Sequence, residues 1–391
     1  MKRIIYVDNA ATTRVSNEVF NAMEPFFIEN FGNPSSIYSI GRECRRAIEN
    51  SRKIIAQCIN AEPSEIFFTS GGTESDNWAI KSGSKLKSGS SVITSQIEHH
   101  AVLNSVKYLE TLGNFETIYL KPDMFGTIQP EALKKKIDRN TSLVSIMMAN
   151  NEIGTIQPIE EFANICKHHG VLFHTDAVQA AGHLEIDTKK LGIDMCSISG
   201  HKFHGPKGIG VLFVKKGLKL SQFLHGGSQE QNKRAGTENV ALIVGMAKAL
   251  ELATVHMKSN SNRLIKMQKK LIKNILKIEK TILTGHPIKR IPGTASFCFE
   301  GVEGESILLN LDAHGIYASS GSACTSGSLD PSHVLLAIGL THEIAHGSLR
   351  LTLGNNNSEE DIDEIINILP KVIAKLRLMS PVWEKISTKI I

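Results

Sequence analysis

Short apolar runs alternate with longer amphipathic stretches through the first half of the chain. Apolar residues recur at helical spacing from Gly41 to Ile59, and an apolar run from Ile66 to Thr69 follows. This rhythm continues to residue 214 and predicts a mostly parallel sheet with helices on both faces. The expected strands are 66–69, 91–95, 117–120, 143–148, 171–174, 195–198 and 209–214, and the expected helices include 101–112 and 159–169.

The order of elements changes after Gly236. A helical pattern covers about 239–278, and Gly285-His286-Pro287 interrupts it. The later elements are expected at 294–299 and 348–353 for strands and at 305–314, 332–338 and 358–379 for helices. We therefore predict an α/β fold: a large domain with a mostly parallel sheet of the seven-stranded type flanked by helices, and a smaller α+β domain.

The composition adds few constraints. The chain has 391 residues, 41% of them hydrophobic and 21% charged, as in soluble globular proteins of two domains. The apolar run after Met1 is too short for a signal peptide, and no segment approaches the ~20 apolar residues of a membrane helix. We expect a cytoplasmic protein. The six cysteines contain no C-x-x-C pair, so neither a disulfide framework nor a metal site is indicated.

The net charge of +5 is concentrated in one segment. Ten Lys and Arg residues stand against Glu279 alone between Lys258 and Arg290, and apolar residues recur there at three- to four-residue steps. The pattern predicts an amphipathic helix with a basic outer face. A solvated surface explains this face best, and an acidic protein or RNA partner is the alternative. We expect no direct binding of nucleic acid.

A lysine stands in a loop of small residues between two expected strands. Lys202 lies within Ser199–Gly208, beside His201 and five residues before Lys207. An amine attacks an aldehyde only when it is neutral, which burial and neighbouring cations favour. A solvated lysine is the ordinary alternative.

A second segment has the pattern of a phosphate site. Strand 66–69 leads into Ser70-Gly71-Gly72-Thr73, followed by a helix start. Thr73 and Asp76 resemble a capping box, so backbone N–H groups would point into the turn. A glycine turn that only caps a helix is the alternative.

Two further segments carry polar groups after apolar strands. Asp176 closes a strand at the sheet edge where α/β proteins bind ligands, and Gln179 follows it. A carboxylate there would keep a pyridine nitrogen protonated, although Asp176 could equally be an N-cap. His99 follows another strand, and an imidazole can stack on a flat ring and move protons. Together these groups fit pyridoxal 5'-phosphate.

The ordered motifs resemble the NifS/IscS-type cysteine desulfurases, pyridoxal-phosphate enzymes of fold type I in the class-V aminotransferase family. The resemblance covers nearly the whole chain. It rests on 6–13 (YVDNAATT), 31–36 (FGNPSS), 150–154 (NNEIG), 234–237 (RAGT) and 319–324 (SSGSAC), besides the segments above.

The resemblance implies a role for each matching residue. Lys202, Cys324 and His99 would be catalytic, and Asn33 and Arg350 would bind the substrate carboxylate. The implied cofactor-binding residues are Gly72, Thr73, His99, Asn151, Asp176, Gln179, Ser199, His201, Lys202 and Thr237, with Thr237 reaching in from the neighbouring subunit of a homodimer. Relatives often carry Arg where this chain has Asn355, which changes the charge near Arg350.

Cys324 stands in a segment with almost nothing to pack. Residues 319–328 contain five serines and two glycines, a composition that predicts a mobile loop. A plain linker with an incidental cysteine is the alternative. The resemblance implies that Cys324 takes sulfur from L-cysteine as a persulfide, leaving L-alanine, and that the loop is of the extended type.

The resemblance also implies domains and partners. Residues 15–258 would form the cofactor-binding domain, and 1–14 with 259–391 the small domain carrying the cysteine loop. The sulfur would pass to an acceptor or iron–sulfur scaffold protein, for cluster assembly or tRNA thiolation. No metal is expected, although Cys324 could transiently ligate a cluster on the scaffold. The tail after Trp383 is shorter than in some relatives whose extension helps to dock the scaffold.

Three other functions remain open. A selenocysteine lyase or an aminotransferase-like relative would share Lys202 and Asp176, but an aminotransferase would not need Cys324. His342-Glu343-Ile344-Ala345-His346 fits the H-E-x-x-H pattern of zinc proteases, which requires a sustained helix, whereas Gly347 follows at once. A non-catalytic sulfur-assembly scaffold would lack the lysine or the loop thiol.

Overall fold

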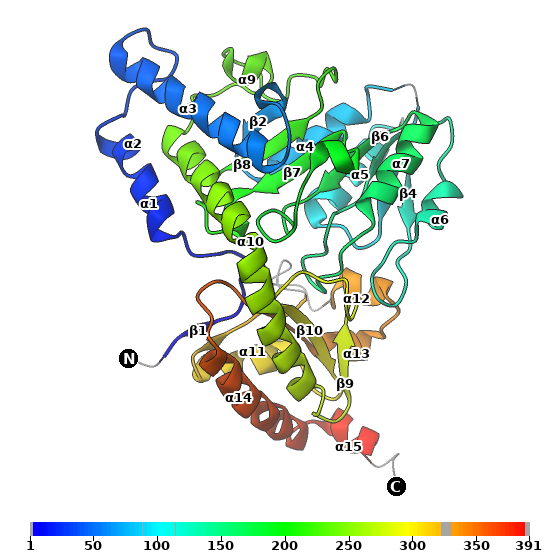
Figure 1. Cartoon of the computed structure of the whole chain (residues 1–391). Helices are drawn as coiled ribbons and strands as arrows, with labels where there is room; N and C mark the ends of the chain where they lie inside the picture. Colours follow the sequence, from blue (N-terminus) through cyan, green and yellow to red (C-terminus); the bar gives the residue numbers. More distant parts are fainter. Residues whose placement is uncertain (1–2, 88, 114, 322–329, 388–391) are drawn as a thin grey trace.

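The molecule has a larger and a smaller lobe joined by one long helix. The structure is a computed structural model that describes residues 3–87, 89–113, 115–321 and 330–387. Helix α10 (Val240–Ile275) begins in the larger lobe and runs into the smaller one (Figure 1). Its buried residues belong to both hydrophobic cores, because Val240 to Leu250 pack in the first and Leu264 to Ile275 in the second. The helix therefore fixes the two lobes relative to each other.

The larger lobe is built on a seven-stranded sheet with the order β2-β8-β7-β6-β5-β3-β4. Strand β8 is antiparallel to both of its neighbours, and the remaining pairs are parallel, so the predicted mostly parallel sheet is confirmed. The strands are β2 (Ile66–Thr69), β3 (Ser91–Ser95), β4 (Glu116–Leu120), β5 (Thr141–Ser145), β6 (Leu172–Asp176), β7 (Met195–Ser199) and β8 (Gly210–Val214).

Helices cover both faces of this sheet and bury its central strands. Every residue of β5, β6, β7 and β8 is buried, as expected for a sheet sandwiched between helices. The helices of the larger lobe are α1 (Asn17–Met23), α2 (Pro25–Ile28), α3 (Ser39–Cys58), α4 (Gly72–Gly83), α5 (His100–Thr111), α6 (Pro130–Lys134), α7 (Ile159–His169), α8 (Thr188–Leu191) and α9 (Gln229–Asn232), with 3-10 turns η1 (Pro63–Glu65) and η2 (Gly200–Lys202).

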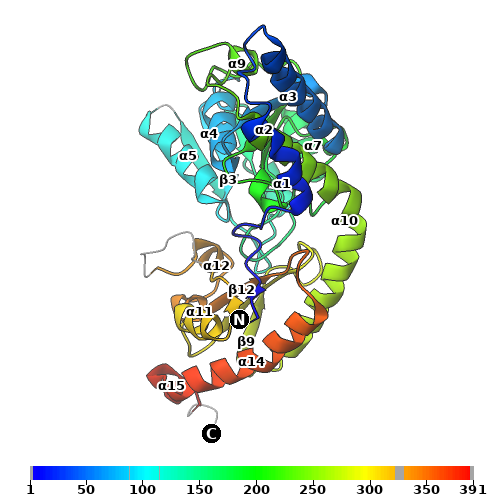
Figure 2. The same ribbon diagram turned by 90° about the vertical axis from the view of Figure 1, so that its left-hand side faces the viewer.

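The smaller lobe packs helices on a three-stranded antiparallel sheet with the order β12-β10-β9. The N-terminal arm joins it, because β1 (Ile5–Tyr6) pairs in parallel with β11 (Ile316–Tyr317). Figure 2 shows this arm leaving the smaller lobe toward the larger one. The other elements are β9 (Thr281–Thr284), β10 (Thr294–Phe299), β12 (Ser348–Thr352), α11 (Gly304–Ala313), α12 (His333–Ala337), α13 (His342–His346), α14 (Glu359–Leu378) and α15 (Pro381–Ser387).

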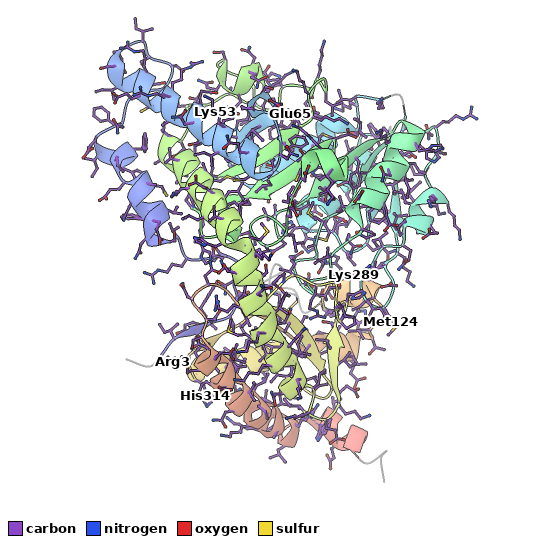
Figure 3. All side chains as sticks on the ribbon, viewed as in Figure 1. Arg3, Lys53, Glu65, Met124, Lys289 and His314 are labelled. Atoms are coloured by element: carbon purple, nitrogen blue, oxygen red, sulfur yellow. The ribbon has the colours of Figure 1, made fainter. Side chains whose placement is uncertain are left out.

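An ion pair also holds the arm to this lobe. Arg3, labelled in Figure 3, pairs with the buried carboxylate of Asp361 near the start of α14. Ser358 caps the same helix, and its side chain accepts the N–H group of Asp361 at 3.3 Å. The arm therefore starts from a fixed point before it crosses to the larger lobe.

The predicted basic helix is shorter than its sequence pattern. Helix α10 ends at Ile275, and Ile282 lies in strand β9, because the apolar run there also suits a half-buried strand. Part of the basic face is neutralised: Lys270 Nζ lies 2.7 Å from Asp363 Oδ1 and 3.4 Å from Glu359 Oε2 of α14. These contacts favour a solvated, ion-paired surface.

Helix α10 differs from the prediction that no segment approaches the apolar length of a membrane helix. By length and composition alone it could cross a membrane, and 44% of its most apolar stretch is buried within the protein. The buried positions pack against α1, α3 and β10. Its apolar character is therefore explained by its position in the two cores.

Candidate active site

A cavity of about 260 Å³ lies between the carboxyl edge of the large sheet and the smaller lobe. It is the place where loops after parallel strands converge. Ten predicted site residues line it: Gly72, Thr73, His99, Asn151, Asp176, Gln179, Ser199, His201, Lys202 and Arg350. The lining also includes Ala10, Ala11, Asp76, Met147 and Val178. Residues from both lobes and from the N-terminal arm therefore form one site.

Lys202 faces the N-terminal arm across the cavity. It closes the turn η2, directly after strand β7. Its Nζ atom donates hydrogen bonds to the carbonyl oxygens of Ala10 at 2.6 Å and Ala11 at 2.9 Å. The arm is itself held to this turn, because Thr13 N donates to His201 O at 2.9 Å. The lysine amine is thus held in a fixed place inside the cavity.

The glycine turn before α4 forms one wall. A Cβ atom at Gly72 would lie 2.5 Å from Val178 Cγ2, so only glycine fits against the loop after β6. The predicted capping box of Thr73 and Asp76 is wrong. The N-cap residue is Gly71, which has no side chain to accept a hydrogen bond. Instead, Glu74 Oε2 accepts the N–H group of Ser70 at 2.8 Å. The first-turn N–H groups still belong to a twelve-residue helix whose N-terminus lines the cavity.

Asp176 ends strand β6 and is 5% exposed. Its Oδ1 atom accepts the N–H group of Val178 at 2.9 Å, but the next helix begins only at Thr188, so the N-cap interpretation is wrong. Burial raises the pKa of Asp176 to about 6, and the N–H group of Val178 and the charge of Lys202 oppose this rise. A cationic partner would stabilise the ionised carboxylate here, as a protonated pyridine nitrogen does.

His99 is a neutral ring at the N-terminus of α5. Its Nδ1 atom accepts the N–H group of Ala101 at 3.1 Å, so the proton of the neutral ring is on Nε2. Burial, Lys202 and His100 lower the pKa of His99 to about 4. The same causes act on His201, where burial and two lysines lower the pKa to about 4. Near neutral pH both rings are therefore neutral, so each can donate one hydrogen bond and accept another.

Two buried acids were not predicted as site residues: Asp76, which lines the cavity, and Glu98, which precedes His99. Asp76 Oδ1 lies 3.6 Å from His174 Nε2 and has no hydrogen-bond partner within the described residues. Burial and the charge of Asp176 raise the pKa of Asp76 well above its usual range. Both oxygens of Glu98 accept the N–H group of Met147 at 3.0 Å, and burial raises the pKa of Glu98 to about 8. These acids lie where the sequence pattern predicted only a cap and a loop.

Replacing Glu98 should change how stability depends on pH. A carboxyl group whose pKa is about 8 in the folded chain and near 4.5 in the unfolded chain makes the free energy of unfolding fall as pH rises between these values. Histidines with lowered pKa act oppositely, but only below about pH 6.5. We therefore expect Glu98→Gln to flatten the fall between pH 6.5 and 8, measured by urea unfolding. An unchanged slope, equal to that of the exposed control Glu160→Gln, would contradict the assignment.

Arg350 provides an anion site on the side of the smaller lobe. It lies in β12 and is 4% exposed. Its Nη1 atom donates to Asn151 O at 2.9 Å and its Nη2 atom to Asp8 Oδ1 at 2.7 Å. Its Nε atom has no hydrogen-bond partner in the described part of the chain. A guanidinium that lines the cavity and keeps one unpaired N–H group within the described residues fits a carboxylate ligand.

Two predicted residues, Asn33 and Thr237, are not brought to this cavity, and a third, Cys324, cannot be placed relative to it from the described residues. Asn33 is exposed, and its Oδ1 atom accepts the N–H group of Ser35 at 2.9 Å. Thr237 is exposed as well and lies outside the cavity lining. Cys324 lies outside the described residues, between the described ends Gly321 and Asp330.

The zinc-protease interpretation finds no support. Helix α13 spans only His342–His346, and strand β12 begins two residues later at Ser348. No group of three or more His, Cys, Asp or Glu residues that could hold a metal ion occurs in the described ranges.

The cavity fits a phosphorylated pyridine aldehyde. Asp176 can pair with a ring nitrogen, Lys202 can bond to an aldehyde, and the N-terminus of α4 with Ser199 and His201 can hold a phosphate. Arg350 lines the same cavity and can pair with a substrate carboxylate. One chain therefore supplies groups that suit both this cofactor and an amino acid.

Comparison with known proteins agrees with this geometry. A family model described as Aminotransferase class-V matches residues 5–365. Cysteine desulfurase IscS of Methanosarcina thermophila is 54% identical over 98% of this chain and 95% of its own length, and that of Dictyoglomus turgidum is 52% identical over 97% of each. A solved structure titled NifS-like protein, 38% identical, has a TM-score of 0.90 and covers 96% of this chain and all of its own. Another, SspA in complex with cysteine, is 37% identical with a TM-score of 0.79, over 90% of this chain and 99% of its own. The chain therefore belongs to the class-V aminotransferase family and, within it, to the NifS/IscS-type cysteine desulfurases.

Proposed function

We propose that this protein removes sulfur from L-cysteine with bound pyridoxal 5'-phosphate, giving L-alanine and a persulfide on Cys324. The observation that carries the proposal is the convergence of Lys202, Asp176, His99 and Arg350 on one buried cavity. An amine, a carboxylate, an imidazole and a guanidinium in this arrangement provide every group that the reaction needs from the described chain. The names of the relatives and the SspA structure with cysteine support the choice of substrate.

The cofactor would be held by residues already in place. Lys202 would bond to its aldehyde and Asp176 would pair with its ring nitrogen, while the neutral ring of His99 would stack on its face. Gln179, whose Nε2 atom donates to Ala10 O at 2.8 Å, and Asn151 would flank the ring. The phosphate would lie against Gly72, Thr73, Ser199 and His201. When bound, the cofactor supplies an electron sink for the substrate Cα atom.

The reaction then depends on proton transfers by this chain. Arg350 orients the substrate carboxylate, so that Cα points to the side of Lys202. The Nζ atom of Lys202 takes the Cα proton as a general base. His99 carries a proton on Nε2 and can exchange it with the substrate thiol. The thiolate of Cys324 attacks the substrate sulfur while the Cβ–S bond breaks and leaves its electron pair on Cβ. Cβ then takes a proton, which gives alanine, and the sulfur remains on Cys324 as a persulfide.

Removal of Arg350 should weaken substrate binding more than turnover. An ion-paired hydrogen bond to a charged group contributes about 1.5 to 3 kcal/mol, which corresponds to roughly 10- to 100-fold in affinity. We expect Arg350→Ala to raise KM for L-cysteine by about this factor, and Arg350→Lys by less, because a lysine keeps the positive charge although it cannot bind both carboxylate oxygens. Steady-state kinetics measure the effect. A variant with unchanged KM would exclude Arg350 as the carboxylate ligand, and Asp8→Asn serves as the control for the lost ion pair.

The direct test of the function is incubation of the purified protein with L-cysteine. We expect alanine and a persulfide on Cys324 to form together, in equal amounts in the first turnover, measured by amino-acid analysis and peptide mass spectrometry. The purified protein should show the visible absorbance of lysine-bound cofactor. Alanine without persulfide would favour another pyridoxal enzyme of the same fold.

The assembly that completes the site is a homodimer. Thr237 is exposed and is not among the residues that line the cavity of its own chain, which supports a role in the neighbouring subunit. The N-terminal helices and the following turn also leave large apolar side chains uncovered, as a subunit interface would require. They are Phe20, Phe27, Ile28, Phe31, Ile37 and Tyr38, each more than half exposed. Sedimentation of the intact protein would give twice the chain mass of 42.8 kDa.

The sulfur acceptor is an iron–sulfur scaffold protein or a tRNA-thiolation protein in the cytoplasm. The curated relatives are named IscS, which supports the first of these. The thiolate of Cys324 would allow a brief bond to a cluster on the scaffold. Transfer of labelled sulfur from the protein to a purified scaffold tests this directly.

A further inference from the structure

Two arginine–carboxylate pairs hold the loop around α9 against α3, β2 and the start of α4 (Figure 1). In the first pair, the Nη1 and Nη2 atoms of Arg52 in α3 donate to Glu230 Oε2 at 2.9 Å and to Glu230 Oε1 at 2.7 Å. In the second pair, the Nε and Nη2 atoms of Arg234 donate to Glu74 Oε1 at 2.8 Å and to Glu74 Oε2 at 3.1 Å. Both pairs are bidentate, a geometry that fixes direction as well as distance.

These pairs reach the main chain on both sides of the point where β2 enters the glycine turn. Glu230 Oε2 also accepts the N–H group of Phe68 in β2 at 2.7 Å, and Glu74 Oε2 accepts that of Ser70 at 2.8 Å. The turn 70–72 follows and leads into the first turn of α4, which lines the cavity. The loop around α9 therefore holds the chain at the entrance to this turn and again at Glu74, just beyond it.

The loop that makes these contacts is held in a strained conformation. Glu230, Gln231 and Asn232 have φ angles of 47°, 56° and 61°, in the region that favours glycine. Side chains disfavour this left-handed region, so three such residues in succession persist only where surrounding contacts fix them. The Arg52–Glu230 pair is such a contact, because its side chains are only 9% and 3% exposed. Arg234, two residues further on, therefore starts from a fixed position.

The charge of Glu74 makes its arginine partner necessary. Glu74 directly follows Thr73, which lines the cavity where we place the cofactor phosphate. Burial opposes the ionisation of Glu74, but the hydrogen bonds from Arg234 and Ser70 lower its pKa overall. An ionised carboxylate beside a phosphate site would repel the phosphate, and the guanidinium of Arg234 neutralises that charge.

We propose that Arg234 is a positioning residue for the cofactor phosphate: through Glu74 it holds the glycine turn in place and cancels the negative charge beside it. The proposal rests on the proposed function, since the phosphate is that of pyridoxal 5'-phosphate. Arg234 does not line the cavity of its own chain, so it acts there through Glu74 and the turn. Its removal should weaken the contacts to the phosphate and leave those to the pyridine ring unchanged.

The test compares two ligands that differ only in the phosphate. Full-length protein freed of cofactor is titrated with pyridoxal 5'-phosphate and with pyridoxal, and the visible absorbance of the lysine-bound aldehyde gives each Kd. We expect Arg234→Met to raise the Kd for pyridoxal 5'-phosphate at least about tenfold and that for pyridoxal by less than about twofold. A merely structural role for Arg234 would weaken both ligands equally. That outcome would overturn the proposal, as would an unchanged Kd for both ligands.

Further variants separate the charge from the hold on the turn. Adding Glu74→Gln to Arg234→Met removes the unpaired carboxylate, so the double variant should bind pyridoxal 5'-phosphate at least about threefold more tightly than Arg234→Met alone. A double variant that binds no more tightly would overturn the proposal. Arg234→Lys keeps the charge but not the bidentate geometry, and its Kd should lie between those of wild type and Arg234→Met.

Glu131→Gln is the matched control for these variants. Glu131 forms an exposed pair with Lys134 at 3.7 Å and lies outside the cavity lining. Exposed pairs of this kind contribute little, so the control should bind both ligands as the wild type does. A loss in Glu131→Gln equal to that in Arg234→Met would show that the effect is not specific to Arg234 and would overturn the proposal.

Hydrogen exchange tests the hold on the turn without cofactor. Because the N–H group of Ser70 donates to Glu74, exchange at residues 70–73 should be at least about threefold faster in Arg234→Met than in wild type, and unchanged in Glu131→Gln. If wild-type protein shows no absorbance of lysine-bound pyridoxal 5'-phosphate, the proposed function fails, while this exchange rate still tests the contact. Equal exchange in all variants would reject the role of Arg234.

Discussion

Lys202→Ala should lose the visible absorbance of lysine-bound cofactor and lower alanine formation by at least about 1,000-fold, because general acid–base catalysis alone contributes about 100- to 10,000-fold. The amine of Lys202 is held in the cavity by the carbonyl oxygens of Ala10 and Ala11, and an alanine side chain cannot reach a substrate Cα atom there. Absorbance spectra and steady-state alanine assays measure the two effects. The variant should still fold, since its neighbours keep their contacts.

Lys207→Ala is the matched control for Lys202. Lys207 lies five residues later in the same loop, and it is exposed, so its removal should leave spectrum and rate unchanged. An active Lys202→Ala protein would contradict the assignment of the base. Loss of activity in both variants would indicate that the loop, and not the amine of Lys202, is responsible.

The parts of the fold that the sequence predicted correctly share a local signal. Short segments with adjacent apolar residues, bounded by polar residues, mark β2, β3 and β7 within one residue of their observed ends, because every residue of these strands is buried. The placement of Asp176 at a strand end follows from the same rule. The helical period through Ile282 was wrong because a half-buried edge strand such as β9 shows no clear alternation over four residues.

The parts that it missed depend on contacts between distant segments. Asp76 has a helix-cap pattern in the sequence, but it turns inward because α4 packs on β6 and β7 next to His174. Glu152 and Ser332 are 180 residues apart, and no periodicity links them. Asp8 meets Arg350 only because the N-terminal arm pairs with the smaller lobe. Such residues can be identified only from the folded chain, in which the two lobes and the N-terminal arm bring them together.

The charges around the cavity follow from this assembly. Burial raises the pKa of Asp176, Glu98 and Glu152, to about 6, 8 and 7, and lowers that of His99 and His201 to about 4. Burial is the first cause in each case, so the protein interior favours neutral groups around the cavity. The ring nitrogen and the phosphate of a bound cofactor would therefore bring strong charges into the cavity, and these charges would orient the side chains that contact them.

Cys324→Ser should abolish persulfide and lower alanine formation to a few per cent or less. The thiolate of Cys324 forms an S–S bond to the substrate sulfur while the Cβ–S bond breaks and its electron pair stays with carbon, and a hydroxyl cannot take this role at neutral pH. No cysteine in the described part of the chain can substitute, because none lines the cavity, and Cys44, Cys166, Cys196 and Cys298 are buried.

The control for Cys324→Ser is Cys58→Ser, which removes a half-buried thiol at the end of α3. It should retain full activity, and both variants should keep the absorbance of bound cofactor, since Cys324 is not a cofactor ligand. Mass spectrometry of the quenched protein then locates the sulfur. Alanine formation at the wild-type rate in Cys324→Ser would assign the chain to the lyase or aminotransferase-like relatives, because only an enzyme that releases sulfur without a protein thiol can work in the absence of this side chain.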